Sequence, residues 1–206
     1  MFVILLAFPI SAAKLQIIDG DTIDLDGVRY RLEGIDAPEL AQQCKAVTGV
    51  WNCGERARDA LVRMTNRHDV RCHGNQRDKY GRMIGYCTAD GIDLNQRMVR
   101  EGFAWAFRKY SMTYVQDEAH AKRAGLGIWQ AKTIPAWQYR SQKWKSAGQA
   151  APNGCAIKGN ISKSGKIYHV PWSKWYDRTR ISLKRGERWF CNEAEAVAAG
   201  WRAPRG

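Results

Sequence analysis

Residues 14–37 alternate apolar and polar side chains, and the alternation breaks only at short stretches rich in Asp and Gly. This period of two is typical of half-buried strands joined by tight turns. Asp26-Gly27 is a strong hairpin signal, because both residue types tolerate the left-handed backbone that a two-residue hairpin needs. The segment therefore predicts antiparallel strands at the start of the folded chain.

Later segments predict a further hairpin and three helices. Residues 54–67 place Ala57, Leu61 and Met64 on one helical face. The other predictions are a hairpin over 69–87, a short helix over 93–102 stopped by Gly102, and a third helix within 111–130, capped by Ser or Thr and ended near Gly125. Strands first and helices later favour an α+β domain with a small barrel.

The chain has six cysteines, and none of them forms a Cys-x-x-Cys pair. This spacing disfavours a zinc ribbon or a thioredoxin-type redox site. In an oxidising compartment, three disulfides are the economical interpretation. Neighbours in the sequence suggest the pairs Cys44–Cys53, Cys72–Cys87 and Cys155–Cys191. The alternative is a reduced cytosolic protein with six buried thiols.

The first thirteen residues, MFVILLAFPISAA, are apolar, uncharged and end in small residues. A membrane-spanning helix needs roughly 20 apolar residues, so no membrane span is expected here. We predict a secretory signal peptide over residues 1–13, cleaved before Lys14, and export to the periplasm or the extracellular space. The usual basic region is missing, and a buried N-terminal strand is the alternative.

Basic residues outnumber acidic residues by 33 to 20, and the excess lies toward the C-terminus. Residues 14–130 hold 18 basic and 16 acidic residues, residues 131–154 hold four and none, and residues 155–206 hold 11 and four. Segment 131–154 ends in Ala, Gly, Pro and Asn, which is typical of a linker. The sequence thus predicts a near-neutral domain over 14–130, a basic linker over 131–154 and a small basic module over 155–206.

A net charge of +13 suits a polyanionic ligand, yet carboxylates are concentrated near the N-terminus. Asp21 and Asp36 lie at the ends of neighbouring predicted strands, so their side chains are expected to converge. A hard divalent cation such as Ca²⁺ prefers carboxylate and carbonyl oxygens, and the backbone at Ala37 adds a carbonyl. The alternative is that the Asp-Gly-Asp stretch serves only its turn.

Glu39 and two arginines extend this candidate site. Glu39 follows Pro38 and is available as a base or water-orienting group. Arg31 lies five residues before Asp36, and Arg82 lies in the predicted hairpin. Guanidinium groups bind phosphate oxygens in a bidentate manner, and with a cation they stabilise the charge of a phosphodiester transition state.

Four motifs in order carry a resemblance to a known family. IIDGDTIDL, RYRLEGIDAPE, DKYGR and GLGIW occur as in the staphylococcal nuclease (thermonuclease) family, and the resemblance covers residues 14–130. It implies an OB-fold, a five-stranded β-barrel with three helices. It implies that Asp21, Asp36 and the Ala37 carbonyl bind calcium, with Asp19 as a third carboxylate nearby. Glu39 is then the general base or water-orienting carboxylate. Arg31 and Arg82 are the implied phosphate-binding arginines, and Lys79 with Tyr80 contacts the neighbouring phosphate.

The sequence departs from the family prototype at a few positions. Ala37 stands where the prototype has threonine, and the loop between Leu40 and Gly54 carries a cysteine pair that the prototype lacks. The prototype has a second nucleotide-contacting tyrosine in the region that corresponds to Arg108 and Tyr110, and no residue of this chain is assigned to it.

The resemblance implies a calcium-dependent endonuclease. It is expected to cleave DNA and RNA alike, mostly in single-stranded regions, at the bond to the 5′ oxygen and to leave 3′-phosphate ends. Ca²⁺ is the expected cofactor, nucleic acid is the expected ligand, and no obligate protein partner is inferred.

Residues 155–206 resemble a short sunset-type accessory domain with a GERWFC…EAEA…GWR pattern. Six of the nine tryptophans lie after residue 130, next to many basic residues. Interleaved cations and aromatics suit a single-stranded nucleic-acid platform. The alternative is that the tryptophans and a disulfide simply give this disulfide-stapled module a core. A zinc site of His169, Cys155 and Cys191 is a further alternative, although a fourth ligand is lacking.

Two rival functions remain open at this stage. One is a nucleic-acid-binding protein without catalysis, and the other is an envelope-associated protein whose tail binds anionic polysaccharide. Deletion of residues 131–206 should leave the chemical step near normal and flatten the salt dependence of nucleic-acid binding.

Overall fold

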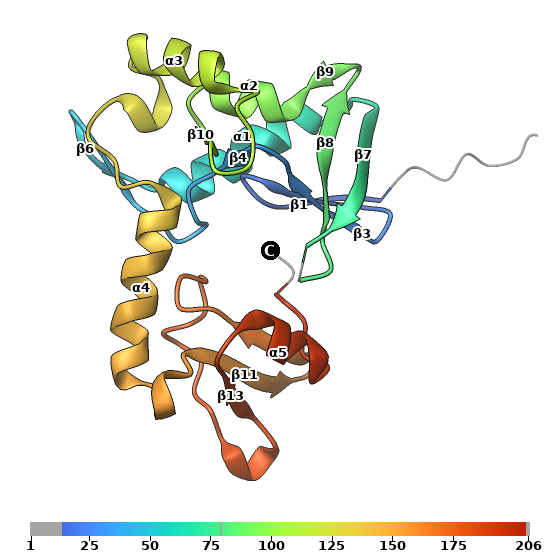
Figure 1. Ribbon diagram of the computed structural model, residues 1–206, viewed down its shortest axis with the longest axis vertical. Coiled ribbons are helices and arrows are strands. Elements are labelled where there is room, and N and C mark those ends of the chain that lie inside the picture. Colours follow the sequence, from blue (N-terminus) through green and yellow to red (C-terminus); the bar gives the residue numbers. More distant parts are fainter. Residues whose placement is uncertain (1–13, 79, 205–206) are drawn as a thin grey trace, which may run out of the picture.

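A computed structural model of the chain describes residues 14–78 and 80–204 (Figure 1). The predicted signal peptide at residues 1–13 lies outside the described residues. The architecture is α+β, as predicted, with a mixed sheet and, in the described part, five α-helices. No helix of the described residues is both long and apolar enough to cross a membrane.

The main sheet is formed by the predicted N-terminal strands and the predicted hairpin. Its strands are β1 (Leu15–Asp19), β2 (Thr22–Leu25), β3 (Val28–Leu32), β7 (Val70–Arg77) and β8 (Met83–Ala89), in the order β1-β2-β3-β8-β7. Strand β9 (Ile92–Asp93) pairs with β8. Asp26 and Gly27 turn the β2–β3 hairpin with φ of 52° and 82°, which confirms the hairpin signal.

Strands β3 and β8 pair in parallel, whereas their neighbours are antiparallel. The strand pairings of the described residues include no ladder between β7 and β1, so closure of the predicted five-stranded barrel is not shown. Two short ladders lie beside this sheet: β4 (Ile35–Asp36) with β10 (Trp105–Ala106), and β5 (Cys44–Ala46) with β6 (Gly49–Trp51).

Three helices form at the predicted places: α1 (Cys53–Thr65) and α2 (Leu94–Arg100) pack on the sheet, and α3 (Val115–Arg123) packs on α2. A 3₁₀ turn follows at Gly127–Trp129. Ala57, Leu61 and Met64 are buried in the core, as their spacing predicts. The predicted Ser or Thr cap of α3 is wrong. The helix starts after Tyr114, which is held in the core while its hydroxyl donates to Asp93 (3.0 Å).

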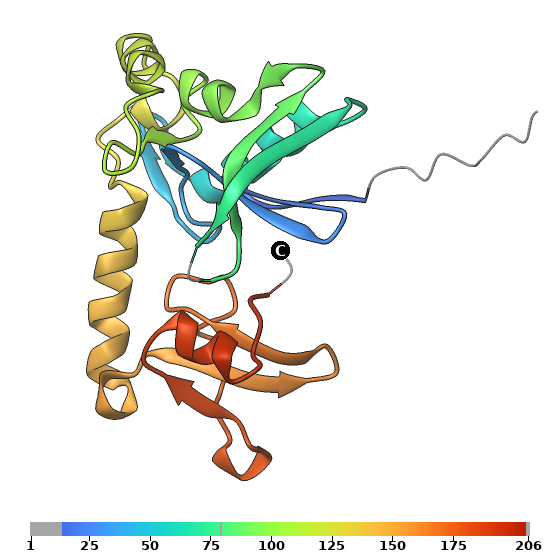
Figure 2. The same ribbon diagram turned by 45° about the vertical axis from the view of Figure 1, so that its right-hand side comes forward.

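Residues 131–154, which the sequence predicts as a basic linker, are mostly helical. Helix α4 (Ala136–Ala150) occupies most of the segment and runs from the nuclease-like sheet to the C-terminal module (Figures 1 and 2). It ends at a 3₁₀ turn, Pro152–Gly154.

The C-terminal module is a small sheet with one helix. Its elements are β11 (Ile157–Ser162), β12 (Gly165–His169), the 3₁₀ turn Leu183–Arg185, β13 (Arg188–Phe190) and α5 (Glu193–Ala198), with strand order β12-β11-β13. Ile157, Tyr168, Phe190 and Trp201 form its core. Trp175 is 46% exposed, so the tryptophans divide between the core and the surface.

All three predicted disulfides are present: Cys44–Cys53, Cys72–Cys87 and Cys155–Cys191. No free cysteine remains. The alternative of six reduced thiols is therefore not what the structure shows. The zinc alternative at His169 is also wrong, because both cysteines it needs are bonded to each other.

Candidate functional site

Arg31 joins the two aspartates that the sequence places at strand ends. Asp21 lies in the β1–β2 turn and Asp36 in β4, and both are buried. The Arg31 guanidinium Nη2 lies 3.1 Å from Asp21 Oδ2 and 2.9 Å from Asp36 Oδ1. Its Nη1 donates to the carbonyls of Leu32 (2.8 Å) and Ile35 (2.9 Å). The predicted convergence of the two carboxylates is thus observed, with an arginine between them.

The surroundings of Asp21 are closely packed. The Ala37 backbone N–H donates to Asp21 Oδ2 (2.8 Å), and the Asp21 N–H donates to Asp19 Oδ1 (3.0 Å). A Cβ at Gly20 would lie 2.7 Å from the Ala37 Cβ and 2.8 Å from the Ala57 Cβ, so only glycine lets this turn approach α1. Burial and the neighbouring Asp21 charge raise the pKa of Asp19 to about 7.

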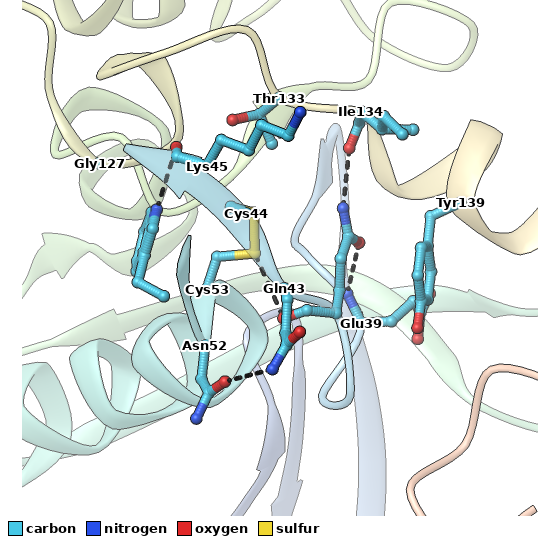
Figure 3. The surroundings of a disulfide bond; sticks show 12 residues. Glu39, Gln43, Cys44, Lys45, Asn52, Cys53, Gly127, Thr133, Ile134 and Tyr139 are labelled. Atoms are coloured by element: carbon cyan, nitrogen blue, oxygen red, sulfur yellow. Dashed lines mark hydrogen bonds between the residues drawn. A yellow bond between two sulfur atoms is a disulfide. The ribbon is translucent and has the colours of Figure 1, made fainter. Parts of the chain in front are cut away.

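The Glu39 loop is tied to α1 and to the segment before α4. The Glu39 N–H donates to Gln42 Oε1 (3.2 Å), while Gln42 Nε2 donates to the Ile134 carbonyl (2.8 Å). Gln42 is 1% exposed, so this link is shielded from water. The Cys44–Cys53 disulfide fixes the far end of the loop to the start of α1 (Figure 3). Glu39 is therefore carried by a braced loop.

Gly54 gives a test of that bracing. Its missing Cβ would fall on the Glu39 carbonyl and 2.9 Å from the Leu40 carbonyl carbon. We expect Gly54→Ala to displace the Glu39 loop and to slow nuclease activity by about 10²-fold, since a shift of about 1 Å in a reacting group has such an effect. Single-turnover cleavage rates measure it.

The matched control is Gly148→Ala on α4. There a Cβ meets nothing closer than the Gly154 carbonyl at 3.8 Å. This substitution should leave the rate unchanged and stabilise the helix by up to about 1 kcal/mol. A Gly54→Ala enzyme with normal rates would show that the loop does not depend on this contact.

Arg140, on α4, is a site residue that the sequence analysis missed. Its Nη1 lies 2.6 Å from Glu39 Oε1 and 3.1 Å from Asp36 Oδ1, and its Nη2 lies 2.9 Å from Asp36 Oδ2. The adjacent Tyr139 points toward the Glu39 loop, where its hydroxyl donates to the Ala41 carbonyl (3.5 Å; Figure 3). Arg140 was overlooked because it lies in a segment whose composition indicates only a linker.

Arg82 approaches the cluster but is bonded elsewhere. Its Nε and Nη2 each lie 2.7 Å from Asp78 Oδ2. Burial opposes its charge, yet Asp78 and the more distant Asp21 and Asp19 raise the pKa of Arg82 above its usual value. Arg82 directly precedes β8 (Met83–Ala89), whose Ile84 is opposite Arg31 in the parallel β3–β8 ladder. The two predicted phosphate-binding arginines therefore come from neighbouring parts of the sheet.

Of the remaining predicted site residues, Lys79 lies outside the described residues. The Tyr80 N–H donates to Asp78 Oδ1 (2.9 Å), and the Arg82 guanidinium lies 5.3 Å from the Tyr80 ring centre. Arg108 pairs with Glu118 (2.7 Å) and Tyr110 is 66% exposed, so neither is joined to the carboxylate cluster by a bond.

The cluster brings four carboxylates close to two guanidiniums. Asp19, Asp21, Asp36 and Glu39 are the carboxylates, and Arg31 and Arg140 are the guanidiniums. Burial raises the pKa of Asp36 above its usual range and that of Glu39 to about 8, although Arg140 opposes both shifts. Burial thus disfavours the ionised carboxylates, whereas the charge of a divalent cation would favour them, and such a cation prefers oxygen ligands.

Side chains alone do not form a complete metal site. In the part of the chain that the structure describes, no group of three or more His, Cys, Asp and Glu side chains is arranged to hold a metal ion. Asp21 and Asp36 supply only two side-chain ligands, so backbone carbonyl oxygens and water would have to complete the shell of a calcium ion. The donor chemistry fits the cation that the family implies, with the backbone supplying part of the shell.

Comparison with known proteins gives two family matches. Residues 29–131 match the family described as "Staphylococcal nuclease homologue", and residues 139–203 match a second family, ArfC. The sunset-type resemblance of the C-terminal module is not confirmed, since the match there is to ArfC.

Three relatives illustrate the similarity. An "Uncharacterized endonuclease" of Escherichia coli O157:H7 is 36% identical over 139 residues, 63% of this chain and 84% of that protein. A "Micrococcal nuclease" of Shigella flexneri is 33% identical over 156 residues, which cover 68% of this chain and 82% of that protein. The "Succinoglycan biosynthesis protein ExoI" of Rhizobium meliloti is 37% identical over 123 residues, which cover 58% of this chain and 64% of that protein. With half of its length matched by the family and its motif carboxylates and arginine brought together, this chain belongs to the staphylococcal nuclease homologue family.

Proposed function

We propose that the protein is an exported, calcium-dependent endonuclease that cleaves DNA and RNA at the 5′ P–O bond and leaves 3′-phosphate ends. The observation that carries the proposal is the bonded cluster of Asp21, Arg31 and Asp36 with Glu39 beside it, inside the segment that matches the nuclease family. Relatives that are named as nucleases support it.

Asp21, Asp36 and the Ala37 carbonyl are the groups that would hold Ca²⁺. Both aspartates are buried, Asp21 in the β1–β2 turn and Asp36 in β4, and their oxygens suit a hard cation. When bound, the cation supplies charge stabilisation for the phosphate oxygens in the transition state.

The chain's own residues supply positioning and proton transfer. Glu39 orients a water molecule at its carboxylate and accepts its proton as the water oxygen bonds to phosphorus; the bond from phosphorus to the 5′ oxygen breaks, and that oxygen takes up a proton from water. Arg31 and Arg82 bind the phosphate oxygens, and Lys79 with Tyr80 contacts the neighbouring phosphate. In this proposal Glu39 takes the proton of the attacking water, and Arg31 and Arg82 hold the phosphate.

The substrate class follows from the site and the surface charge. The proposed groups contact only phosphate, which DNA and RNA share, so no dependence on the ribose 2′ hydroxyl is expected. Single-stranded regions are the preferred targets. Three disulfides suit an oxidising compartment, so the periplasm or the extracellular space is the proposed location.

The test is hydrolysis of denatured DNA by the purified chain, with calcium and with a chelator. We expect cleavage only with calcium, and product ends that a polymerase extends only after phosphatase treatment. Tight binding without cleavage in either buffer would favour a non-catalytic nucleic-acid-binding protein. Neither binding nor cleavage, with retention on the cell wall through the C-terminal module, would favour the envelope-associated alternative.

A further inference from the structure

Arg140 lies outside the segment that matches the nuclease family, yet it is bonded to the nuclease site. The family match ends at residue 131, and Arg140 lies nine residues later on α4. Its guanidinium makes three bonds of 2.6 to 3.1 Å to Asp36 and Glu39. A surface arginine on an independent linker would not be expected to place its fork on two partly or fully buried carboxylates.

The bonds of Arg140 use the same oxygens that a cation needs. Asp36 Oδ2 accepts from Arg140, and Asp36 Oδ1 accepts from both Arg140 and Arg31. A carboxylate oxygen whose lone pairs are engaged by guanidinium N–H groups has less to offer a cation. Two positive groups around one carboxylate also repel each other. Arg140 and a divalent cation are therefore competitors for Asp36.

Contacts of the chain around the start of α4 hold the backbone of Arg140 in place. Tyr139 donates to the Ala41 carbonyl, and Gln42 donates to the Ile134 carbonyl just before α4. These contacts hold the first turn of α4 against the Glu39 loop whatever the guanidinium binds. The Arg140 side chain is 24% exposed, so it is not fully sealed from solvent.

We propose that Arg140 is a substrate-binding residue of the nuclease that is released by the cation. Ca²⁺ takes Asp36 from Arg140, and the freed guanidinium binds a phosphate of the nucleic acid next to Glu39. The inference rests on the proposed nuclease function for its second half, whereas the competition for Asp36 stands without it.

The first test is calcium binding without nucleic acid, measured by isothermal titration of the full chain with CaCl₂. Removing a positive charge beside the carboxylates should strengthen calcium binding, so we expect Arg140→Gln to lower the Kd about tenfold. Arg140→Lys keeps the charge but loses the bidentate guanidinium, and its Kd for calcium should lie between those of the wild-type chain and Arg140→Gln. An unchanged or higher Kd for Arg140→Gln would overturn the competition.

The second test is the split between kcat and KM on single-stranded DNA at saturating calcium. Loss of a bidentate guanidinium–phosphate contact should raise KM about tenfold in Arg140→Gln, with a smaller effect on kcat. A purely structural role would lower stability without this split. An unchanged KM would overturn the phosphate contact.

Lys143→Gln is the matched control on the same helix. Lys143 carries the same charge one turn further on, and its ammonium lies over the Tyr139 ring at 5.7 Å. If mere charge reduction on α4 explained the results, this variant would reproduce them. Should the wild-type chain prove to have no nuclease activity, the calcium titration still decides the competition at Asp36, so the two proposals fail separately.

Discussion

Glu39→Gln is expected to slow the hydrolysis of denatured DNA by about 10³-fold, within the range for loss of a general base. Glutamine keeps the volume of the side chain and still accepts the bond from Arg140, which is 2.6 Å in the native protein. It cannot take a proton from water. Burial raises the pKa of Glu39 to about 8, so a neutral side chain here should not destabilise the fold. Stopped-flow rates at saturating calcium measure the effect.

The control for this variant is Glu101→Gln at the C-terminal end of α2, where the carboxylate pairs with Arg97 and is 41% exposed. It should cleave at the wild-type rate. Binding of a labelled single-stranded oligonucleotide in chelator should be unchanged in Glu39→Gln, because a base contributes to the reaction and not to phosphate affinity. A native rate in Glu39→Gln would remove Glu39 from the role assigned to it.

Asp36→Asn should abolish calcium binding and lower the cleavage rate by roughly 10³-fold or more, since a metal contributes several kcal/mol to the transition state. Asp36 is fully buried and accepts guanidinium bonds from Arg31 and Arg140. The amide has one oxygen in place of two and no charge, so it holds neither arginine nor cation as before. Calcium titration and cleavage rates of the same preparation give the result.

Asp59→Asn, on α1, is the matched control because its carboxylate is 44% exposed and pairs only with its neighbour Arg58. Calcium affinity should be native in this variant. Full calcium binding by Asp36→Asn would show that the cation is held elsewhere, and the interpretation of the carboxylate cluster would then be wrong.

Much of the fold could be predicted because its signals are local. The Asp26-Gly27 turn and the buried face of α1 each depend on residues within one element. The disulfides also follow from cysteines that are neighbours in the sequence. The cap of α3 was wrong because burial of Tyr114 in the core, a tertiary effect, decides where that helix begins.

The site could be predicted only in part, because some of its contacts join distant segments. Asp21, Arg31 and Asp36 are close together in the sequence, so two neighbouring short motifs contain them all. The Arg140–Glu39 and Arg140–Asp36 bonds span 101 and 104 residues, and no periodic pattern announces them. The bond between Arg82 and Asp78 is local, since the two residues are four apart, but it was not among the predictions.

Arg140 also changes one expectation from the sequence. Deletion of residues 131–206 removes Arg140 and also Ile134 and Tyr139, whose bonds brace the loop that carries Glu39. We therefore no longer expect such a deletion to leave the chemical step near normal. The nuclease-like segment and the region after it share one site.

The order of the disulfides has a consequence for how the chain matures. Cysteines pair strictly in succession, first with second, third with fourth and fifth with sixth. Six thiols allow 15 pairings, yet in a chain that crosses a membrane N-terminus first each cysteine meets its correct partner as the next one to arrive. A thiol oxidase that joins each cysteine to the next one translocated would form all three native disulfides. A disulfide isomerase would be needed only when the whole chain is chemically reduced and refolded.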